Sequence, residues 1–191
     1  MKFKKEIFQI KITLNDSKPP IWRRFLVESN VKLPDLHKII QTVMGWTNSH
    51  LHQFDKNGQY FCEPAEQEYY ETIDYTDIQL KEFLFEERDT CYYEYDFGDS
   101  WRHKIVLEKI LPFDKNQNYP VCTAGKKNCP PEDCGGIWGY YNLLEIIKNP
   151  KHPDYESMMD WLEEDFDPEY LDLEEINELL QKKDFGCFSM F

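Results

Sequence analysis

The stretch CYYEYDFGDSWRHKIVLEKI, residues 91–110, decides the fold of this chain. Its two runs, 91–97 and 101–110, are rich in aromatic and β-branched residues, and the Gly98-Asp99-Ser100 sequence between them is typical of a turn. A slip of one residue would mix apolar and charged side chains on both faces. The register that avoids this pairs Phe97 with Trp101, Tyr95 with His103, Tyr93 with Ile105 and Cys91 with Leu107, and on the other face Asp96 with Arg102 and Glu94 with Lys104. We therefore expect an antiparallel hairpin.

Further strand patterns precede this hairpin, with one helix among them. Apolar and polar side chains alternate with period two in the first of these strands, whereas apolar residues recur at helical spacing in the helix. The predicted elements are, in order, strands at 6–14 and 21–27, a helix from Pro34 to a stop at Gly45, a strand at 50–54, a turn at Asn57-Gly58 and a strand at 59–62, followed by the weakly patterned acidic stretch 63–89.

Helical patterns follow the hairpin. After a loop over 112–136, rich in Cys, Pro and Gly, we expect helices at about 137–147, 155–164 and 173–181. Strands first and helices last indicate an α+β fold with a mostly antiparallel sheet, one helix between the N-terminal strands and three C-terminal helices packed on the sheet. We expect one domain over residues 1–191, with strands and one helix in 1–111 and the other helices in 137–182.

Composition excludes several classes of protein. The chain has 191 residues, of which 41% are hydrophobic and 16% aromatic, so it can bury a sizeable core. No apolar run approaches the roughly 18 residues that a membrane-spanning helix needs. The N-terminal residues MKFKKEIFQIKI alternate charged and apolar residues and lack the continuous apolar segment of a secretory signal. We therefore expect a cytoplasmic protein with no membrane partner.

The charge balance bears on possible partners. The formal net charge is −14, and only the N-terminal third carries a basic excess, through Lys2, Lys4, Lys5, Lys11, Arg23 and Arg24. A duplex-binding protein needs several basic side chains on one face to neutralise phosphates. Solvated strand edges guarded by charge explain these residues as well. Nucleic-acid binding by the chain alone is therefore disfavoured, and basic protein partners stay open.

Three of the six cysteines lie close together, at Cys122, Cys129 and Cys134. Thiolates are good zinc ligands, and a metal clip would stabilise a long loop. The spacing lacks the C-x2-C pattern of common zinc motifs, and a fourth ligand would have to come from His50, His52 or His103, of which the first two share a face if both lie on one strand. Two other interpretations stay open: buried thiols that pack as small hydrophobic residues, and a redox or nucleophilic cysteine.

A second candidate site is carboxylate-rich. His103 is a possible general base, with Asp96, Asp99, Glu132 and Asp133 as acids around a divalent ion. The alternative is structural, since His103 falls on the aromatic face of the hairpin and the aspartates fall in turns. Residues 161–170, WLEEDFDPEY, lack the ligand spacing of a calcium loop and are interpreted as a solvated acidic face. The common catalytic signatures are missing from the sequence.

Five ordered motifs carry a resemblance to a known family: PPIWRR (19–24), LHKIIQTVMGWTNSHLHQF (36–54), YDFGDSWRHKIVLE (95–108), CPPEDCGGIWGY (129–140) and WLEEDFDPEYLDLEEIN (161–177). Together they resemble the plasmid pRiA4b ORF-3-like family. This resemblance implies a link to plasmids and insertion elements, but no established activity or catalytic residues. Some relatives carry a resolvase label, which this chain does not fit, because its tail is acidic and its arginines are few.

We therefore expect a non-enzymatic binding or accessory module that acts through protein partners. The alternative is a metal-dependent hydrolase or nucleic-acid-processing enzyme that uses the Asp96/Asp99/His103 turn. Zinc is the one cofactor that the sequence suggests, at the cysteine loop. The surface that we expect to carry function comprises Asp96, Gly98, Asp99, Trp101, Glu132, Asp133 and Trp138.

Overall fold

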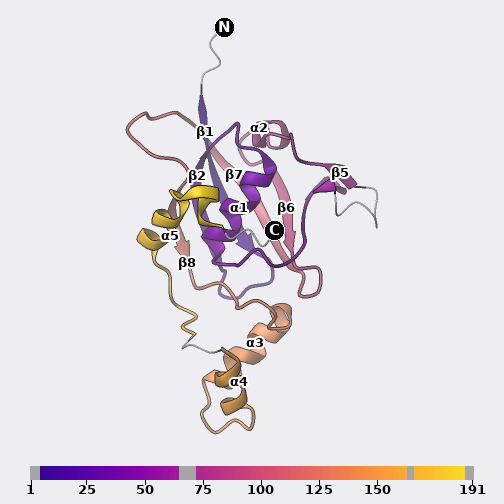
Figure 1. Cartoon of the computed structure of the whole chain (residues 1–191), viewed down its shortest axis with the longest axis vertical. Helices are drawn as coiled ribbons and strands as arrows, with labels where there is room; N and C mark the ends of the chain where they lie inside the picture. The colour runs from indigo at the N-terminus through magenta and orange to yellow at the C-terminus, as the bar shows by residue number, and fades with distance from the viewer. Residues whose placement is uncertain (1–4, 65–71, 163–165, 188–191) are drawn as a thin grey trace.

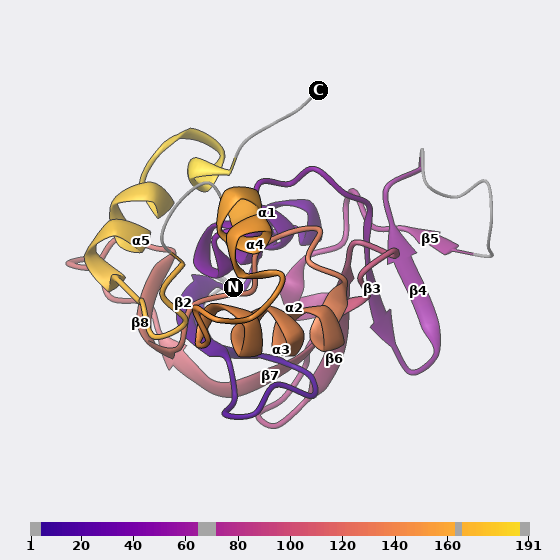
Figure 2. The same ribbon diagram turned by 90° about the horizontal axis from the view of Figure 1, so that it is seen from below.

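The computed structural model describes residues 5–64, 72–162 and 166–187. Eight strands form one sheet: β1 (Glu6–Leu14), β2 (Trp22–Glu28), β3 (His52–Lys56), β4 (Gln59–Cys62), β5 (Thr72–Asp74), β6 (Thr90–Tyr95), β7 (Trp101–Pro112) and β8 (Val121–Lys126). Their spatial order is β5-β4-β3-β6-β7-β1-β2-β8 (Figure 1, with β3 and β4 labelled in Figure 2). Every neighbouring pair is antiparallel except β4 and β5. The predicted α+β class with a mostly antiparallel sheet is confirmed.

The 12-residue helix α1 (Leu33–Met44) packs on the concave face of this sheet (Figure 2). Pro34 lies in its first turn, where a missing N–H costs nothing. Gly45 ends it in the left-handed conformation, with φ of 93°, and donates its N–H to the Gln41 carbonyl. The face between these ends is wholly buried at Leu36, Ile39, Ile40 and Val43, which pack with inward-facing strand residues in one core. The buried helix therefore fixes the position of Gly45, where the segment toward β3 begins.

The remaining helices are α2 (Leu80–Phe83), α3 (Gly136–Ile147), α4 (Tyr155–Leu162), α5 (Leu173–Leu180) and the 3-10 turn η2 (Lys183–Gly186). Of the three C-terminal helices, α5 packs beside β8 and α1, whereas α3 and α4 pack on each other beyond one end of the sheet (Figure 1). The expectation that all three lie on the sheet is therefore only partly right. No helix in the described ranges is long and apolar enough to cross a bilayer.

The hairpin of β6 and β7 forms with a different register. Tyr95 faces Trp101 and Tyr93 faces His103, a shift of two residues from the prediction. The cause is Asp96, which leaves the strand with φ of 57°, donates its N–H to the Leu51 carbonyl and accepts the Gly98 N–H on its carboxylate. The turn therefore spans 96–100. Because a shift of two preserves which side each residue faces, the aromatic face is still formed.

Two elements differ from the sequence analysis in ways that affect the candidate sites. The predicted loop over 112–136 contains the edge strand β8, which pairs with β2 and places Cys122 opposite Phe25. The outer edge of β8 is closed by Asn177 of α5, whose side chain accepts the Cys122 N–H and donates to its carbonyl. Strand β3 begins at His52, so His50 lies outside the strand and does not share a strand face with His52.

Candidate functional site

The two motifs expected to carry function are in contact. Asp99, in the turn between β6 and β7, accepts the N–H of Gly135 at 3.1 Å, just before α3. Gly136 has φ of 67°, and a Cβ atom there would lie 2.5 Å from the Asp99 carbonyl oxygen. Such a close approach of two backbones requires glycine. The Gly135-Gly136 pair therefore joins segment 129–136 to the hairpin turn.

A histidine and two aspartates converge at this junction. His50 Nε2 lies 3.3 Å from Asp133 Oδ1 and 3.8 Å from Asp96 Oδ2. One ligand atom from each residue lies within 4.8 Å of the others, and this is the one such group of three metal-ligating side chains in the described part of the chain. Asp96 is buried, whereas Asp133 is exposed. All three residues were predicted from the sequence as candidate metal ligands, but His50 was grouped with the cysteines and the two aspartates with His103.

His103, the base expected beside Asp96 and Asp99, is not part of this group. Its ring is fully buried and packs edge-on against Trp46 at a centroid distance of 5.2 Å. Burial lowers the pKa of His103 to about 3, although the backbones of Trp101 and Tyr93 act in the opposite direction. His103 is thus a neutral core residue, and the Asp96/Asp99/His103 set does not assemble.

His52 is also a core residue. It stacks on His37 of α1, with ring centroids 3.5 Å apart, and its Nε2 shares a hydrogen bond of 2.8 Å with the Tyr75 hydroxyl. Burial lowers the pKa of His37 to about 4 and places that of His52 well below its ordinary value. His52 therefore points into the sheet–helix core rather than toward the cysteine segment.

The three clustered cysteines do not form a ligand set in the described residues. Cys122 lies on β8 and contacts the Ala124 carbonyl, whereas Cys134 contacts the Gly136 carbonyl. Burial raises the pKa of Cys122 to about 11 and that of Cys134 to about 12, and it raises the pKa of Cys129 still further. Protonated thiols, buried at Cys122 and Cys129 and partly buried at Cys134, match the packing interpretation of the sequence.

The basic N-terminal side chains are used within the fold. Arg23 is buried and donates to the carbonyls of Val43, Trp22 and Lys126. Arg24 pairs with Glu108 at 2.5 Å and lies over the Trp22 ring. Lys5 pairs with Glu28. The Lys11 ammonium group also lies over the Trp22 ring, 4.8 Å from its centroid. Lys2 and Lys4 lie outside the described residues. Each of the four described basic side chains therefore has a contact within the fold.

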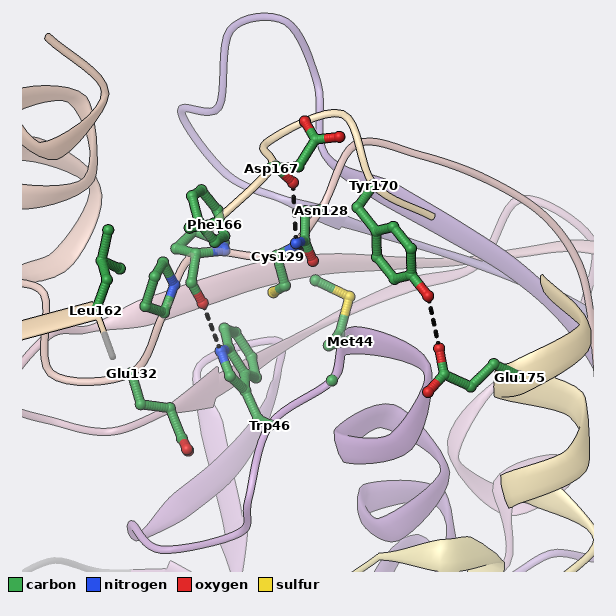
Figure 3. Close-up of a pocket in the computed structure, with 13 residues that line it drawn as sticks. Met44, Trp46, Asn128, Cys129, Glu132, Leu162, Phe166, Asp167, Tyr170 and Glu175 are labelled. Carbon is green, nitrogen blue, oxygen red and sulfur yellow. Dashed lines mark hydrogen bonds between the residues drawn. The ribbon is translucent and has the colours of Figure 1, made fainter. Parts of the chain in front are cut away.

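A cavity of about 530 Å³ lies beside residues 128–132 (Figure 3). It is lined by the end of α1, by Trp46, by residues 128–132, by the last residue of α4, by residues between α4 and α5, and by Glu175 of α5. Six of the 13 described residues that line it are aromatic or acidic, and none of the 13 is basic. The aromatic members are Trp46, Phe166 and Tyr170, and the acidic members are Glu132, Asp167 and Glu175.

Hydrogen bonds hold the walls of this cavity in place (Figure 3). Trp46 Nε1 donates to the Pro130 carbonyl at 3.1 Å, and Tyr170 donates to Glu175 at 2.9 Å. Glu132 accepts from the Tyr95 and Thr47 hydroxyls, both at 2.5 Å. Glu132 therefore links the cavity wall to strand β6.

The aromatic side of this cavity was not predicted from the sequence. Phe166 and Tyr170 belong to the stretch interpreted as a solvated acidic face, and the available signal was their alternation with acids. Of the expected surface, Trp101 is buried in the core, whereas Trp138 is 83% exposed on the first turn of α3. A side chain at Gly98 would approach Asp96 Oδ1 at 3.1 Å, so this glycine shapes the turn.

Comparisons with known proteins give the family. The chain matches the family described as plasmid pRiA4b ORF-3-like protein over residues 6–175. The uncharacterized protein y4hQ of Sinorhizobium fredii is 33% identical over 156 residues, which are 81% of this chain and 80% of that protein. The crystal structure of MM3350, a protein of unknown function from Methanosarcina mazei Go1, is 38% identical with a TM-score of 0.81, covering 90% of this chain and 98% of the other. The chain belongs to the plasmid pRiA4b ORF-3-like family.

Proposed function

We propose that this protein is a non-enzymatic binding module that takes up a basic segment of a protein partner, with a Lys or Arg side chain entering the cavity beside Trp46. The observation that carries the proposal is the composition of the cavity wall, which includes three aromatic and three acidic residues. Each feature alone is common on protein surfaces. Their combination in one cavity selects for a cation with an apolar stem.

The chemistry of such a ligand matches the wall in two ways. A guanidinium or ammonium group is attracted to the face of an aromatic ring, here Phe166 or Tyr170, and pairs with a carboxylate such as Glu175. The methylene stem of the same side chain can pack on Met44 and Leu162, which also line the cavity. A volume of about 530 Å³ leaves room for flanking backbone.

The net charge of the whole chain also favours a basic partner. A net charge of −14 attracts basic partners over longer distances and speeds their association. The hydrolase alternative has less support, because its expected base, His103, is buried in the core. A protein that only binds a partner through its acidic surface needs no general base.

Fluorescence anisotropy with labelled oligoarginine, oligolysine and oligoglutamate peptides tests the proposal. We expect the basic peptides to bind and the acidic peptide not to bind. Glu175→Gln removes one carboxylate from the wall, and Glu178→Gln is the matched control, because it lies on the same helix, removes the same charge and does not line the cavity. We expect about three- to tenfold weaker binding for Glu175→Gln alone, the loss of about one partly desolvated charge contact.

Two results would contradict the proposal. One is equal weakening by both variants, which would show that general surface charge, rather than the cavity, attracts the peptide. The other is failure of the unaltered protein to bind either basic peptide at low salt, where charge attraction is strongest.

A further inference from the structure

We propose that His50, Asp96 and Asp133 form a binding site for one divalent first-row transition-metal ion, of which Zn²⁺ is the best match. The site is separate from the peptide cavity of the proposed function. It joins three segments that are far apart in the sequence: the residues before β3, the turn between β6 and β7, and the segment before α3.

The donor set favours a transition metal. Imidazole nitrogen is a common ligand of Zn²⁺ and its neighbours, whereas Mg²⁺ and Ca²⁺ prefer sites built from oxygen alone. Two carboxylates supply the negative charge that holds a divalent ion. Three protein ligands leave at least one position for water or another group, as in zinc sites that are not purely structural.

The distances fit a zinc ion with little movement. Bond lengths of about 2.0 to 2.2 Å to nitrogen and oxygen give a tetrahedral ligand–ligand separation of about 3.4 Å. His50 Nε2 and Asp133 Oδ1 are 3.3 Å apart, and His50 Nε2 and Asp96 Oδ2 are 3.8 Å apart. The Asp133 side chain is 69% exposed, so it can rotate to complete the geometry.

A second observation concerns the imidazole nitrogen itself. His50 Nε2 is shielded from solvent, yet it makes no hydrogen bond within the described residues, even though Asp133 Oδ1 is within reach. A buried polar atom of this kind normally has a partner. A metal ion between the nitrogen and the two carboxylates would supply that partner.

The surroundings orient Asp96, and His50 is the basic side chain that lies beside both acids. Asp96 Oδ1 accepts the Gly98 N–H at 2.9 Å, which fixes the carboxylate with Oδ2 toward His50. Within the described residues, neither Asp96 nor Asp133 forms an ion pair with a Lys or Arg. Two carboxylates held beside one imidazole therefore favour a bound cation.

Calorimetric titration of the chelator-treated full chain with Zn²⁺ alone, followed by native mass spectrometry, tests the site. We expect one ion per chain. Asp133→Asn is the main variant, because Asn also tolerates the left-handed backbone that Asp133 adopts, with φ of 59°. Loss of a direct ligand should weaken binding by about tenfold or more, since even an outer-shell change costs about that much.

Three further variants make the result decisive. His50→Gln should weaken binding as Asp133→Asn does, whereas His152→Gln, at a partly buried histidine with one nearby aspartate, should leave it unchanged. Cys134→Ser tests the thiols, and Zn²⁺ binding should survive it. Circular dichroism checks that each variant is folded. The proposal is overturned if the unaltered chain binds no Zn²⁺, or if binding is lost in Cys134→Ser and kept in Asp133→Asn.

Discussion

Replacing His103 with phenylalanine should make this protein more resistant to acid. His103 lies on β7 opposite Tyr93, is fully buried and packs edge-on against Trp46. Neither ring nitrogen makes a hydrogen bond of normal geometry with the described residues. Phenylalanine keeps the ring and its contact with Trp46 but has no group that binds a proton.

The magnitude follows from the difference in proton affinity between the folded and unfolded chain. Burial lowers the pKa of His103 to about 3 in the fold, against an ordinary value of about 6.5 when unfolded. Because the unfolded state binds the proton first, stability is complete above the ordinary pKa and is lost as the pH falls toward the folded value. When the pH falls from about 7 to about 5, the effect of His103 alone should lower the free energy of unfolding by about 2 kcal/mol.

Urea unfolding at the two pH values, followed by tryptophan fluorescence, measures this difference. His103→Phe should lose about 2 kcal/mol less than the unaltered protein on acidification, and it should be no less stable at neutral pH, because it buries no unpaired nitrogen. His37 and His52 remain and should retain part of the acid sensitivity. His103→Gln separates the two effects, since it abolishes titration but buries an amide. The reasoning is refuted if His103→Phe and the unaltered protein lose the same free energy.

Two further substitutions test contacts around the candidate sites. Gly136→Ala should destabilise the protein by about 2 kcal/mol more than Gly58→Ala in urea unfolding, because both positions have positive φ but only Gly136 lies against the Asp99 carbonyl; equal losses would argue against that contact. Asn177→Ala should cost about 1 to 3 kcal/mol and speed hydrogen exchange at the Cys122 amide, which loses its side-chain partner. Unchanged exchange at Cys122 would contradict this.

Local patterns predicted the elements that local chemistry determines. The alternation in 6–14 and the Pro34 and Gly45 signals predicted β1 and α1 closely, because periodicity and capping act within a few residues. The register of the main hairpin was wrong because Asp96 is held by the Leu51 carbonyl, a contact across the sheet that the hairpin sequence does not contain. Strand β8 was missed for a similar reason, since its pairing depends on distant partners.

The candidate sites show the same limit. His50, Asp96 and Asp133 were each recognised as residues with metal-binding chemistry, but their grouping depends on where β3 begins and how the turn at 96–100 is held. The cavity was missed because its walls come from the end of α1, the segment before α3 and the approach to α5. The sequence alone predicts which residue types could bind a metal or a ligand. It does not predict which of them lie together in the fold.

The way α5 closes β8 has a consequence for association between copies of the protein. Strand β8 ends the sheet, and an open edge of this kind invites a strand from another molecule. Here Asn177 occupies both polar groups of Cys122, and Gln181 donates to the Pro120 carbonyl. The last helix therefore serves as a cap against edge-to-edge aggregation, and a chain truncated before α5 would expose a surface for intermolecular strand addition.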